Sequence, residues 1–352
     1  MLPPPAVRRF GCPYQGSKSQ IAWQLINALP AADTFVDLFA GGCAMTHAAL
    51  LSGKYKHFLA NDLGGIPQVF LDAIHGAAHD RSRWLRWVTR EEFVAERNKP
   101  FAERDLGKMI IWSFGNNGND YLYGTYLEPW KRALWAARVD GDYSLLAEFG
   151  IITTDASRKA VLRNREEWTG KYIAWYKAHG GGNEKGIQRL QSLQSLERLQ
   201  SLESLQSLQS LQRLQDLQSL QSLQSLGHLR ISKLDYRRVP IPANSCVYAD
   251  PPYESTEDYC GYSKQENQKE GEKIGFDNPA FWQWVRTRDF PVFVSEYTAP
   301  EDFVPILQIE KRQLMRGGLD ASHKVTENLF VHNRFAAQFK PQTITQGTLF
   351  DL

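Results

Sequence analysis

The residues best suited to chemistry stand together in Asp250-Pro251-Pro252-Tyr253, which directly follows the apolar run 246–249. Proline fixes φ and has no N–H, so the carbonyls of this rigid segment stay open to hydrogen-bond donors. The Asp250 carboxylate is a second acceptor, and Tyr253 adds a flat ring. Two acceptors and a stacking face suit the exocyclic amine of a planar base, which a duplex exposes only when that base leaves the stack. An ordinary strand with a proline-stiffened turn is the alternative.

A second chemical stretch lies near the start of the chain, where the apolar run 34–40 leads into Gly41-Gly42. Glycine lets the backbone approach a ligand closely at the carboxyl end of a first parallel strand. The next apolar run, 57–60, ends in Asn61-Asp62, and an acid there commonly holds a ribose diol. The spacing is not G-x-G-x-x-G and no Walker lysine follows, which disfavours a dinucleotide or a triphosphate. A nucleoside-like ligand is predicted, with a ligand-free sheet edge as the alternative.

The segment Tyr14-Gln15-Gly16-Ser17-Lys18 precedes an amphipathic run at 21–29 that Pro30 ends. We expect Ser17 to cap this helix. Free N–H groups at a helix N-terminus favour an anion, although a capped surface helix would show the same pattern.

Taken in order, Y-x-G-S-K, FVDLFAGG, AND and YADPPY resemble the Dam-type family of DNA adenine-N6 methyltransferases. The motifs cover roughly residues 12–75 and 240–335. One departure is Gly41-Gly42-Cys43, where the family often has Gly-x-Gly. The resemblance implies an α/β, Rossmann-like sheet that uses S-adenosylmethionine to methylate a flipped adenine at N6 in double-stranded DNA.

The resemblance also implies a role for each motif residue. Asp250 and the Pro251 carbonyl would accept the amine hydrogens, with Pro252 in the same motif, and Tyr253 would stack on the base. Asp250 would be an acceptor first and a proton sink later, because the amine becomes acidic only after methylation. No metal and no covalent protein nucleophile are needed.

On the cofactor side, Gly41 and Gly42 would line the turn and Asp62 would hold the ribose. Asp37 and Lys18 would lie near the methionine amino and carboxylate groups. The full set of predicted cofactor-binding residues is Tyr14, Lys18, Asp37, Phe39, Gly41, Gly42 and Asp62.

Between these motifs, residues 82–177 form a mainly helical candidate region for target recognition. Its basic excess is slight, so most of its tryptophans are predicted to be core rather than base-stacking groups. The glycine- and asparagine-rich segment 113–121 is a predicted loop. In position it is similar to the family's FNG-type loop near cofactor and target base, but it reads FGNNG. The tryptophans are Trp84, Trp87, Trp112, Trp130, Trp135, Trp168 and Trp175.

After a glycine hinge at 180–183, leucine recurs every third residue from Leu190 to Leu229. On an α-helix such a stripe slips by about 60° per repeat, and 3₁₀-helices that would align it are rarely long. We therefore favour a compact solenoid ending in a strand at LRISKLDYRRV, with a helix as the alternative. Because the tract carries little charge, a spacer or an interaction surface is favoured over phosphate binding.

The last part of the chain returns to the sheet. A substrate-closing loop is predicted over 254–273, a helix begins near Phe281, and strands are predicted at 291–297 and, at the sheet edge, 328–331. The tail Gln346-Gly347-Thr348-Leu349-Phe350 is similar to the Q-x-x-L-F peptide with which some bacterial proteins bind the replication sliding clamp.

The predicted organisation is a catalytic domain interrupted by insertions. Its cofactor part is 1–80 and its DPPY part 236–340. Between them lie the inserted recognition region 81–179 and the hinge with leucine-triplet repeat 180–235, and a tail follows at 341–352.

Composition sets the broad class. The 352 residues are 42% hydrophobic and 12% aromatic, enough for a packed core, and the net charge of +2 argues against a wholly basic surface but not against a basic cleft. The four cysteines form no CxxC pair and no zinc-type spacing. There is no signal-peptide core and no long apolar run, so a soluble cytoplasmic protein without a membrane segment is expected.

Other functions stay open on the sequence alone. One is methyl transfer to RNA or to a protein glutamine, and another is a non-enzymatic interaction protein that uses the leucine repeat. A dinucleotide oxidoreductase ranks last, because its fingerprint is missing. A restriction nuclease would have to be a separate protein, since no second catalytic constellation appears.

Overall fold

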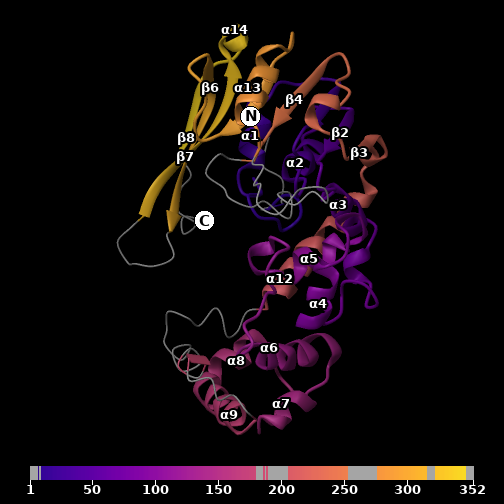
Figure 1. Ribbon diagram of the computed structural model, residues 1–352, viewed down its shortest axis with the longest axis vertical. Coiled ribbons are helices and arrows are strands. Elements are labelled where there is room, and N and C mark those ends of the chain that lie inside the picture. The colour runs from indigo at the N-terminus through magenta and orange to yellow at the C-terminus, as the bar shows by residue number, and fades with distance from the viewer. Residues whose placement is uncertain are drawn as a thin grey trace. The chain divides into compact units, whose positions relative to one another are not determined.

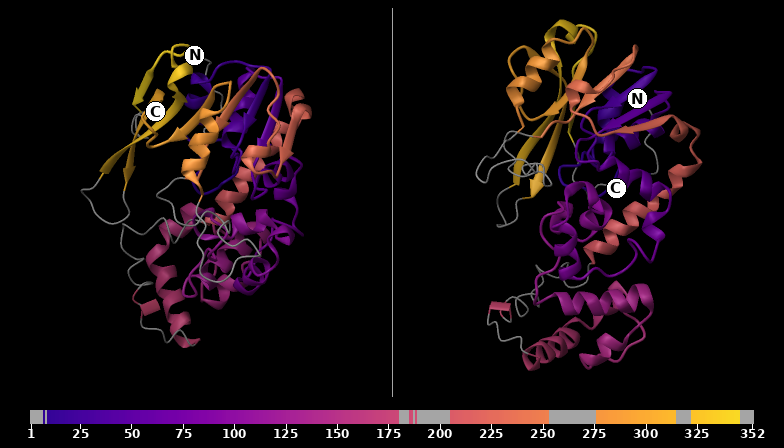
Figure 2. Two further views of the ribbon diagram at one scale, coloured as in Figure 1. Left: turned by 45° about the horizontal axis from the view of Figure 1, so that its top comes forward. Right: turned by 45° about the vertical axis from the view of Figure 1, so that its right-hand side comes forward.

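The computed structural model describes residues 7, 9–179, 185, 186, 188, 205–252, 276–314 and 322–345. It divides the chain into two compact units, Met1–Ala77 with Leu214–Leu352, and Ala78–Arg213 (Figures 1 and 2).

Several predicted features lie outside the described residues. They are Tyr253, the loop 254–273, the hinge 180–183, the part of the leucine repeat before Leu205, and the tail 346–350.

The first unit is built on an eight-stranded sheet with the order β3-β2-β1-β4-β5-β7-β6-β8. The strands β3, β2, β1, β4 and β5 run parallel, β7 is antiparallel to both β5 and β6, and β8 is parallel to β6. This mixed sheet is consistent with the expected Rossmann-like methyltransferase fold. The strands are β1 Thr34–Asp37, β2 His57–Asn61, β3 Leu229–Ser232, β4 Ser245–Ala249, β5 Val292–Glu296, β6 Phe303–Leu314, β7 Ser322–His332 and β8 Gln342–Thr345.

Helices flank this sheet. They are α1 Ala22–Ala28, α2 Ala44–Ser52, α3 Pro67–Ile74, α13 Asn278–Arg286 and α14 Asn333–Ala336, with the short 3₁₀ turns η6 Leu217–Ser222, η7 Gln224–His228 and η8 Tyr236–Arg238. The expected cap of α1 is wrong: the residue before the helix is Ile21, and no side chain caps it. The helix does end before Pro30, as predicted.

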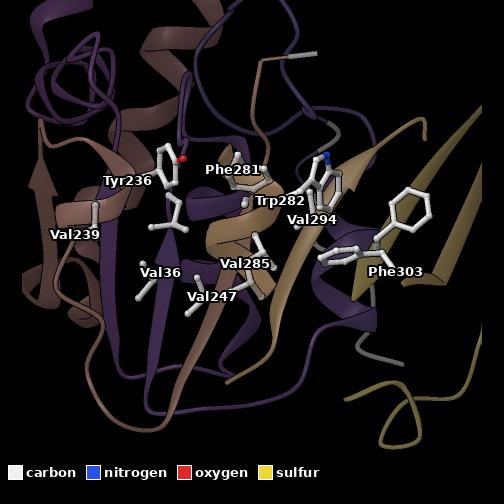
Figure 3. Packing of buried hydrophobic residues seen from close by; sticks show 13 residues of the cluster. Val36, Tyr236, Val239, Val247, Phe281, Trp282, Val285, Val294 and Phe303 are labelled. Atoms are coloured by element: carbon white, nitrogen blue, oxygen red, sulfur yellow. The ribbon is translucent and has the colours of Figure 1, made fainter. Parts of the chain in front are cut away.

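One hydrophobic core lies between the parallel strands and α13 (Figure 3). Successive strand residues point to opposite faces. Val36 of β1 therefore joins Phe281 and Val285 of α13 in this core, whereas its neighbour Asp37 is turned toward α2. A polar residue can thus sit at the end of a buried strand without disrupting the core.

Two predictions about strands need correction. The strand containing 328–331 is not an edge strand, because β7 lies between β5 and β6. The outer strands of the described sheet are β3 and β8. The hairpin partner β6 was not predicted, and its pairing with β7 is what buries that strand.

The predicted solenoid is wrong for the part of the leucine repeat that the structure describes. Residues Gln206–Asp216 form the α-helix α12. Since a three-residue period does not match 3.6 residues per turn, the buried positions include Ser207 and Ser210 as well as Leu211 and Leu214. Ser207 and Ser210 belong to the second unit, and their hydroxyls have partners within it, Tyr123 Oη at 3.0 Å and Asn116 Nδ2 at 2.9 Å.

The repeat then changes its helix type. In η6 the chain is 3₁₀-helical, with three residues per turn, and Leu217 and Leu220 are both buried. The predicted strand after the repeat does exist as β3, but it pairs with β2 of the main sheet instead of ending a coil.

The second unit is helical. Five of the seven tryptophans are buried, as predicted for core residues, and Trp87 and Trp175 are half-buried. Besides most of α12, the helices in its described part are α4 Arg90–Arg97, α5 Leu106–Ile111, α6 Glu128–Trp135, α7 Ser144–Glu148, α8 Arg158–Arg163 and α9 Arg165–Ala178, with short turns η1 Ala77–His79, η2 Phe101–Glu103 and η3 Phe114–Asn116 and a π-helical turn η4 Ala136–Asp140.

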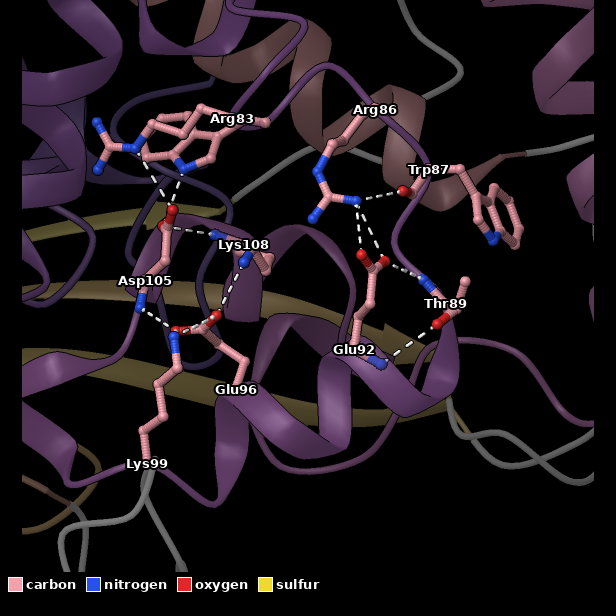
Figure 4. Close-up of polar contacts among 10 residues, drawn as sticks. Arg83, Arg86, Trp87, Thr89, Glu92, Glu96, Lys99, Asp105 and Lys108 are labelled. Carbon is pink, nitrogen blue, oxygen red and sulfur yellow. Dashed lines mark hydrogen bonds and ion pairs between the residues drawn. The ribbon is translucent and has the colours of Figure 1, made fainter.

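A polar network joins α4 to α5 in this unit (Figure 4). The buried Glu96 carboxylate accepts hydrogen bonds from Lys99 and Lys108 and from the backbone N–H of Asp105. Burial acts to raise the pKa of Glu96, but these partners together outweigh it and lower the pKa to about 2. The Asp105 carboxylate in turn caps α5 and accepts a bond from Trp84 Nε1. Glu96 therefore has a structural role.

In the described part of the chain, no helix is both long and apolar enough to cross a membrane.

We predict that Asn61→Ala destabilises the first unit by about 3 kcal/mol, because several buried polar groups lose their partners. The Asn61 side chain donates to the carbonyls of Leu38 and Leu234, and it accepts from Ser232 Oγ and Leu234 N. Urea unfolding would measure the loss. The control Gln283→Ala, at an exposed position of α13, should unfold like the wild type; an unchanged Asn61→Ala would contradict this account of the strand ends.

Candidate active site

The site lies where the strand order of the sheet reverses. The sheet extends from β1 to β2 and β3 on one side, and from β1 to β4 and β5 on the other. In such sheets ligands bind beyond the carboxyl ends of the strands at this point. Asp37 ends β1 and pairs with Tyr248 of β4, so Asp250 comes just beyond the end of the neighbouring strand. Topology alone brings these two predicted site residues to the same edge.

Asp37 is held in place by the first turn of α2. Its Oδ2 accepts hydrogen bonds from Thr46 Oγ1 at 2.7 Å and Thr46 N at 3.2 Å. Cys43 precedes the helix in a left-handed conformation and caps nothing, so Asp37 satisfies a free N–H of the helix. Asp37 Oδ1 is buried and has no hydrogen-bond partner among the described residues. Burial raises the pKa of Asp37 to about 7.

The glycine turn after β1 is tied to the end of β2. Asp62 Oδ2 accepts from Gly41 N at 3.0 Å, and Asp62 Oδ1 accepts from Gly64 N at 2.8 Å. Burial raises the pKa of this half-buried carboxyl, and the two N–H groups act against that shift. Asp62 thus fixes the turn, and its contact with a ribose stays a prediction.

The departure from Gly-x-Gly has a structural consequence. Cys43 occupies φ 59°, a left-handed conformation that glycine adopts without strain. For a residue with a Cβ this conformation costs roughly 1–2 kcal/mol. The third residue of the turn therefore adopts a glycine-like conformation although it is cysteine, and it carries backbone strain at the site.

Residues 10–14 cover this turn closely. Cys12 N donates to Gly42 O at 2.7 Å, and Gly11 N donates to His47 Nδ1 at 3.0 Å. A Cβ on Gly42 would lie 2.9 Å from Tyr14 Cβ and 3.0 Å from Cys12 O, so no larger residue fits without a shift. A Cβ on Gly41 would lie 3.2 Å from Tyr14 Cε1. Tyr14 therefore lies against both glycines, and binding of a cofactor by these three residues stays a prediction.

The structure places Lys18 on Asp250, a contact that the sequence did not reveal. Lys18 Nζ lies 2.7 Å from Asp250 Oδ1 and 2.8 Å from Oδ2. The lysine side chain is 5% exposed and the aspartate 18%. The ammonium stabilises the negative charge of the carboxylate in this partly buried setting. Its predicted place near the methionine end of the cofactor stays a prediction.

Two further acids on the neighbouring strands were missed. Glu327 of β7 is buried, with Oε1 3.6 Å from Lys18 Nζ and 3.0 Å from Ser295 Oγ. Glu296 ends β5, and its Oε2 accepts from Tyr297 N at 2.7 Å. Burial and, to a lesser extent, the charge of Asp250 raise the pKa of Glu296 to about 7. Of these two acids, only Glu296 had a signal in the sequence, because it follows an apolar run that predicts a strand.

Three predicted site residues remain. Of these, Pro251 is buried and Pro252 is half-buried. Phe39 packs edge-to-face against Phe276 and Phe281, which gives it a place in the core; its contact with a cofactor stays a prediction.

The FGNNG segment is held within the second unit. Asn116 Nδ2 donates to Ile110 O and Ser210 Oγ, while the Phe114 side chain is 49% exposed. Its predicted role beside cofactor and target base stays a prediction.

Comparison with known families supports the resemblance found in the motifs. Residues 14–97 match the family model described as D12 class N6 adenine-specific DNA methyltransferase. The match includes the glycine turn, Asp37 at the end of β1 and Asp62 just after β2, and it ends before β4 and Asp250. No curated protein matches the chain significantly.

We predict that Asp37→Asn changes the pH dependence of stability. In the folded protein Asp37 keeps its proton up to about pH 7, whereas the unfolded chain loses it near the ordinary value of 3.8. The contribution of Asp37 to the free energy of unfolding, a few kcal/mol, is therefore fully present below pH 4 and is lost as the pH rises toward 7. Urea unfolding between pH 4 and 8 should show that Asp37→Asn lacks this loss. Parallel pH profiles for the two proteins would contradict it.

Proposed function

We propose that this protein transfers a methyl group from S-adenosylmethionine to N6 of an adenine flipped out of double-stranded DNA. One observation carries the proposal. The glycine turn with Asp37 and Asp62 and the Asp250-Pro251-Pro252 segment lie on the two sides of the reversal point of one sheet. The family match over 14–97 supports adenine methyltransferase activity and covers the first of these two parts.

The residues on the β1–β2 side fit S-adenosylmethionine. Asp37 Oδ1 is a buried acceptor without a hydrogen-bond partner among the described residues, which suits the amino group of the methionine part. The tight turn at Gly41 and Gly42 allows close backbone approach, and Asp62 lies where a ribose diol is commonly held. When bound, this cofactor supplies an electrophilic methyl group on its sulfonium.

On the β4 side, the residues suit the N6 amine. Asp250 and the Pro251 carbonyl would accept its two hydrogens, which draws the nitrogen lone pair out of conjugation with the ring. Tyr253 follows directly in the chain and would stack on the base. The methylated nitrogen then loses a proton, for which Asp250 is the proposed acceptor. Fixed charges and alignment supply the rate enhancement in this scheme.

Lys18 has a defined part in this proposal. With both carboxylate oxygens within 2.8 Å of it, the Lys18 ammonium stabilises the negative charge of Asp250 and fixes the orientation of this carboxylate before the substrate arrives. A carboxylate without this cation would be costly to bury next to Glu296 and Glu327. The Lys18 ammonium has three N–H donors, and its contact with the methionine carboxylate stays a prediction beside its contact with Asp250.

Duplex DNA is the proposed substrate, and the second unit is the proposed target-recognition region. Binding of a sliding clamp through Gln346–Phe350 would be a separate property of the tail.

The direct test is transfer of labelled methyl groups from S-adenosylmethionine to unmethylated duplex DNA, followed by digestion to nucleosides. We expect label in N6-methyladenosine, and loss of at least a hundredfold in rate for Asp250→Ala and Asp250→Asn, because each lacks the charged acceptor. Asp72→Asn, at a half-buried position of α3 that has no part in the proposed site, is the control and should retain activity. Label in RNA or protein but not DNA would overturn the substrate, and no transfer to any of them would overturn the proposal.

A second test concerns the cofactor side. Because Asp37 must be ionised to hold an ammonium group, affinity for S-adenosylhomocysteine should rise as pH passes through the Asp37 pKa of about 7. Calorimetry of the wild type and Asp37→Asn from pH 5.5 to 8.5 isolates this effect, since titration of the ligand itself is common to both. Equal pH dependence in the two proteins would show that Asp37 does not bind the amino group.

A further inference from the structure

The first turn of α2 holds two parts of the proposed cofactor site. Thr46 Oγ1 donates to Asp37 Oδ2, and the next residue, His47, accepts from Gly11 N at 3.0 Å through its Nδ1. Gly11 belongs to residues 10–14, the covering segment, which passes over the glycine turn after β1. One helical turn therefore fixes both the carboxylate at the end of β1 and the segment that covers the turn.

The imidazole of His47 acts as an acceptor toward Gly11. A backbone N–H always donates, so Nδ1 carries no proton, and the ring is neutral with its proton on Nε2. The side chain is 3% exposed, and burial lowers the pKa of His47 to about 3. The acceptor is therefore present throughout the neutral pH range.

Histidine places a costly donor in an apolar setting here. Its Nε2 is buried and has no hydrogen-bond partner among the described residues, and its ring packs against Phe10 and Phe70. A leucine would fill the same space without an unsatisfied N–H, which is unfavourable in the interior. What histidine adds at this position is the bond from Gly11 to Nδ1.

The covering segment has little freedom where it meets the turn. Gly11 has a φ of 68°, and a Cβ on it would overlap Gly42 O, so only glycine fits there. Cys12 N donates to the same Gly42 O at 2.7 Å. Tyr14, three residues beyond Gly11, lies against this turn. A displacement of Gly11 from α2 would therefore also displace Tyr14.

We propose that His47 is a positioning residue for S-adenosylmethionine binding: its Nδ1 holds the covering segment, and with it Tyr14, in place over the glycine turn. This inference rests on the proposed function. His47 acts through Gly11 and has no proposed contact with the cofactor. Without this bond only a fraction of the molecules would hold the segment in place, and the apparent affinity would fall by that fraction.

Two substitutions separate the acceptor from the packing. His47→Leu keeps an apolar side chain of similar size and lacks the acceptor, whereas His47→Asn places Oδ1 near the position of Nδ1 and lacks most of the ring. Calorimetry with S-adenosylhomocysteine should give an affinity about tenfold lower for His47→Leu, and within about threefold of wild type for His47→Asn. Stability should follow the opposite order, because His47→Asn leaves a cavity and a buried amide.

Tyr55→Phe is the matched control. The buried Tyr55 donates through Oη to Pro30 O at 3.0 Å, and it lies just before β2, at the end of the strand opposite the proposed site. This variant loses a buried hydrogen bond in the same unit, so it should be less stable but keep wild-type affinity.

Kinetics provide a second readout. In methyl transfer, His47→Leu should raise the KM for S-adenosylmethionine about tenfold and leave kcat within about twofold, because the groups that face the base are unchanged. If affinity falls in proportion to stability across the variants, or if His47→Leu binds as tightly as Tyr55→Phe, His47 is only structural and the inference is overturned. Thermal melting identifies any variant that does not fold, and His47→Met then stands in for His47→Leu.

A readout without activity separates this inference from the proposed function. Hydrogen exchange of residues 10–14 in the ligand-free protein should be faster in His47→Leu and close to wild type in His47→Asn and Tyr55→Phe. Unchanged exchange in His47→Leu would show that His47 does not hold the covering segment. If exchange becomes faster but the wild type binds no S-adenosylhomocysteine, the contact stands and the proposed function fails.

Discussion

The pairing of β1 with β4 is the constraint on which the rest of the site depends. Leu38 N donates to Tyr248 O at 2.9 Å just past the end of β1, so the two strands stay paired up to the point where both chains leave the sheet. Both strands are buried, and their side chains fill a core with α13. Polar residues are therefore confined to the strand ends. That confinement brings Asp37 and Asp250 to one edge although they lie far apart in the sequence.

The edge gathers more negative charge than a stable interior favours. Asp37, Asp250, Glu296 and Glu327 lie at or near the carboxyl ends of adjacent strands or on the partner strand, and burial raises the pKa of Asp37 and Glu296 to about 7. Groups with such perturbed pKa values concentrate at functional sites, because charge that folding leaves poorly compensated is available to a ligand. Cys43, in a left-handed conformation, adds backbone strain at the same edge. These costs are consistent with a site shaped for cationic and amine groups.

The leucine repeat shows how one sequence period serves two kinds of helix. In α12 the period of three is out of phase, and the buried positions fall on Ser207 and Ser210, whose hydroxyls bond to Tyr123 and Asn116. In η6 the helix has three residues per turn, so Leu217 and Leu220 lie on one face. Leucine and serine are both tolerated at buried positions here because each buried serine has a hydrogen-bond partner.

The sequence by itself determined the parts of the site that depend on local pattern. The apolar runs ending in Asp37 and Asp62, the glycines at 41 and 42 and the Asp250-Pro251-Pro252 segment each identified a strand end, because strand, turn and helix signals are short-range. Only the tertiary structure decided which groups meet. The contact of Lys18 with Asp250, the approach of Glu327 from β7 and the inner position of β7 all follow from strand order, and strand order depends on pairings between distant segments that no local period encodes. The repeat lay between these cases: its leucines were plain in the sequence, but whether they formed a solenoid or helices depended on what packed against them.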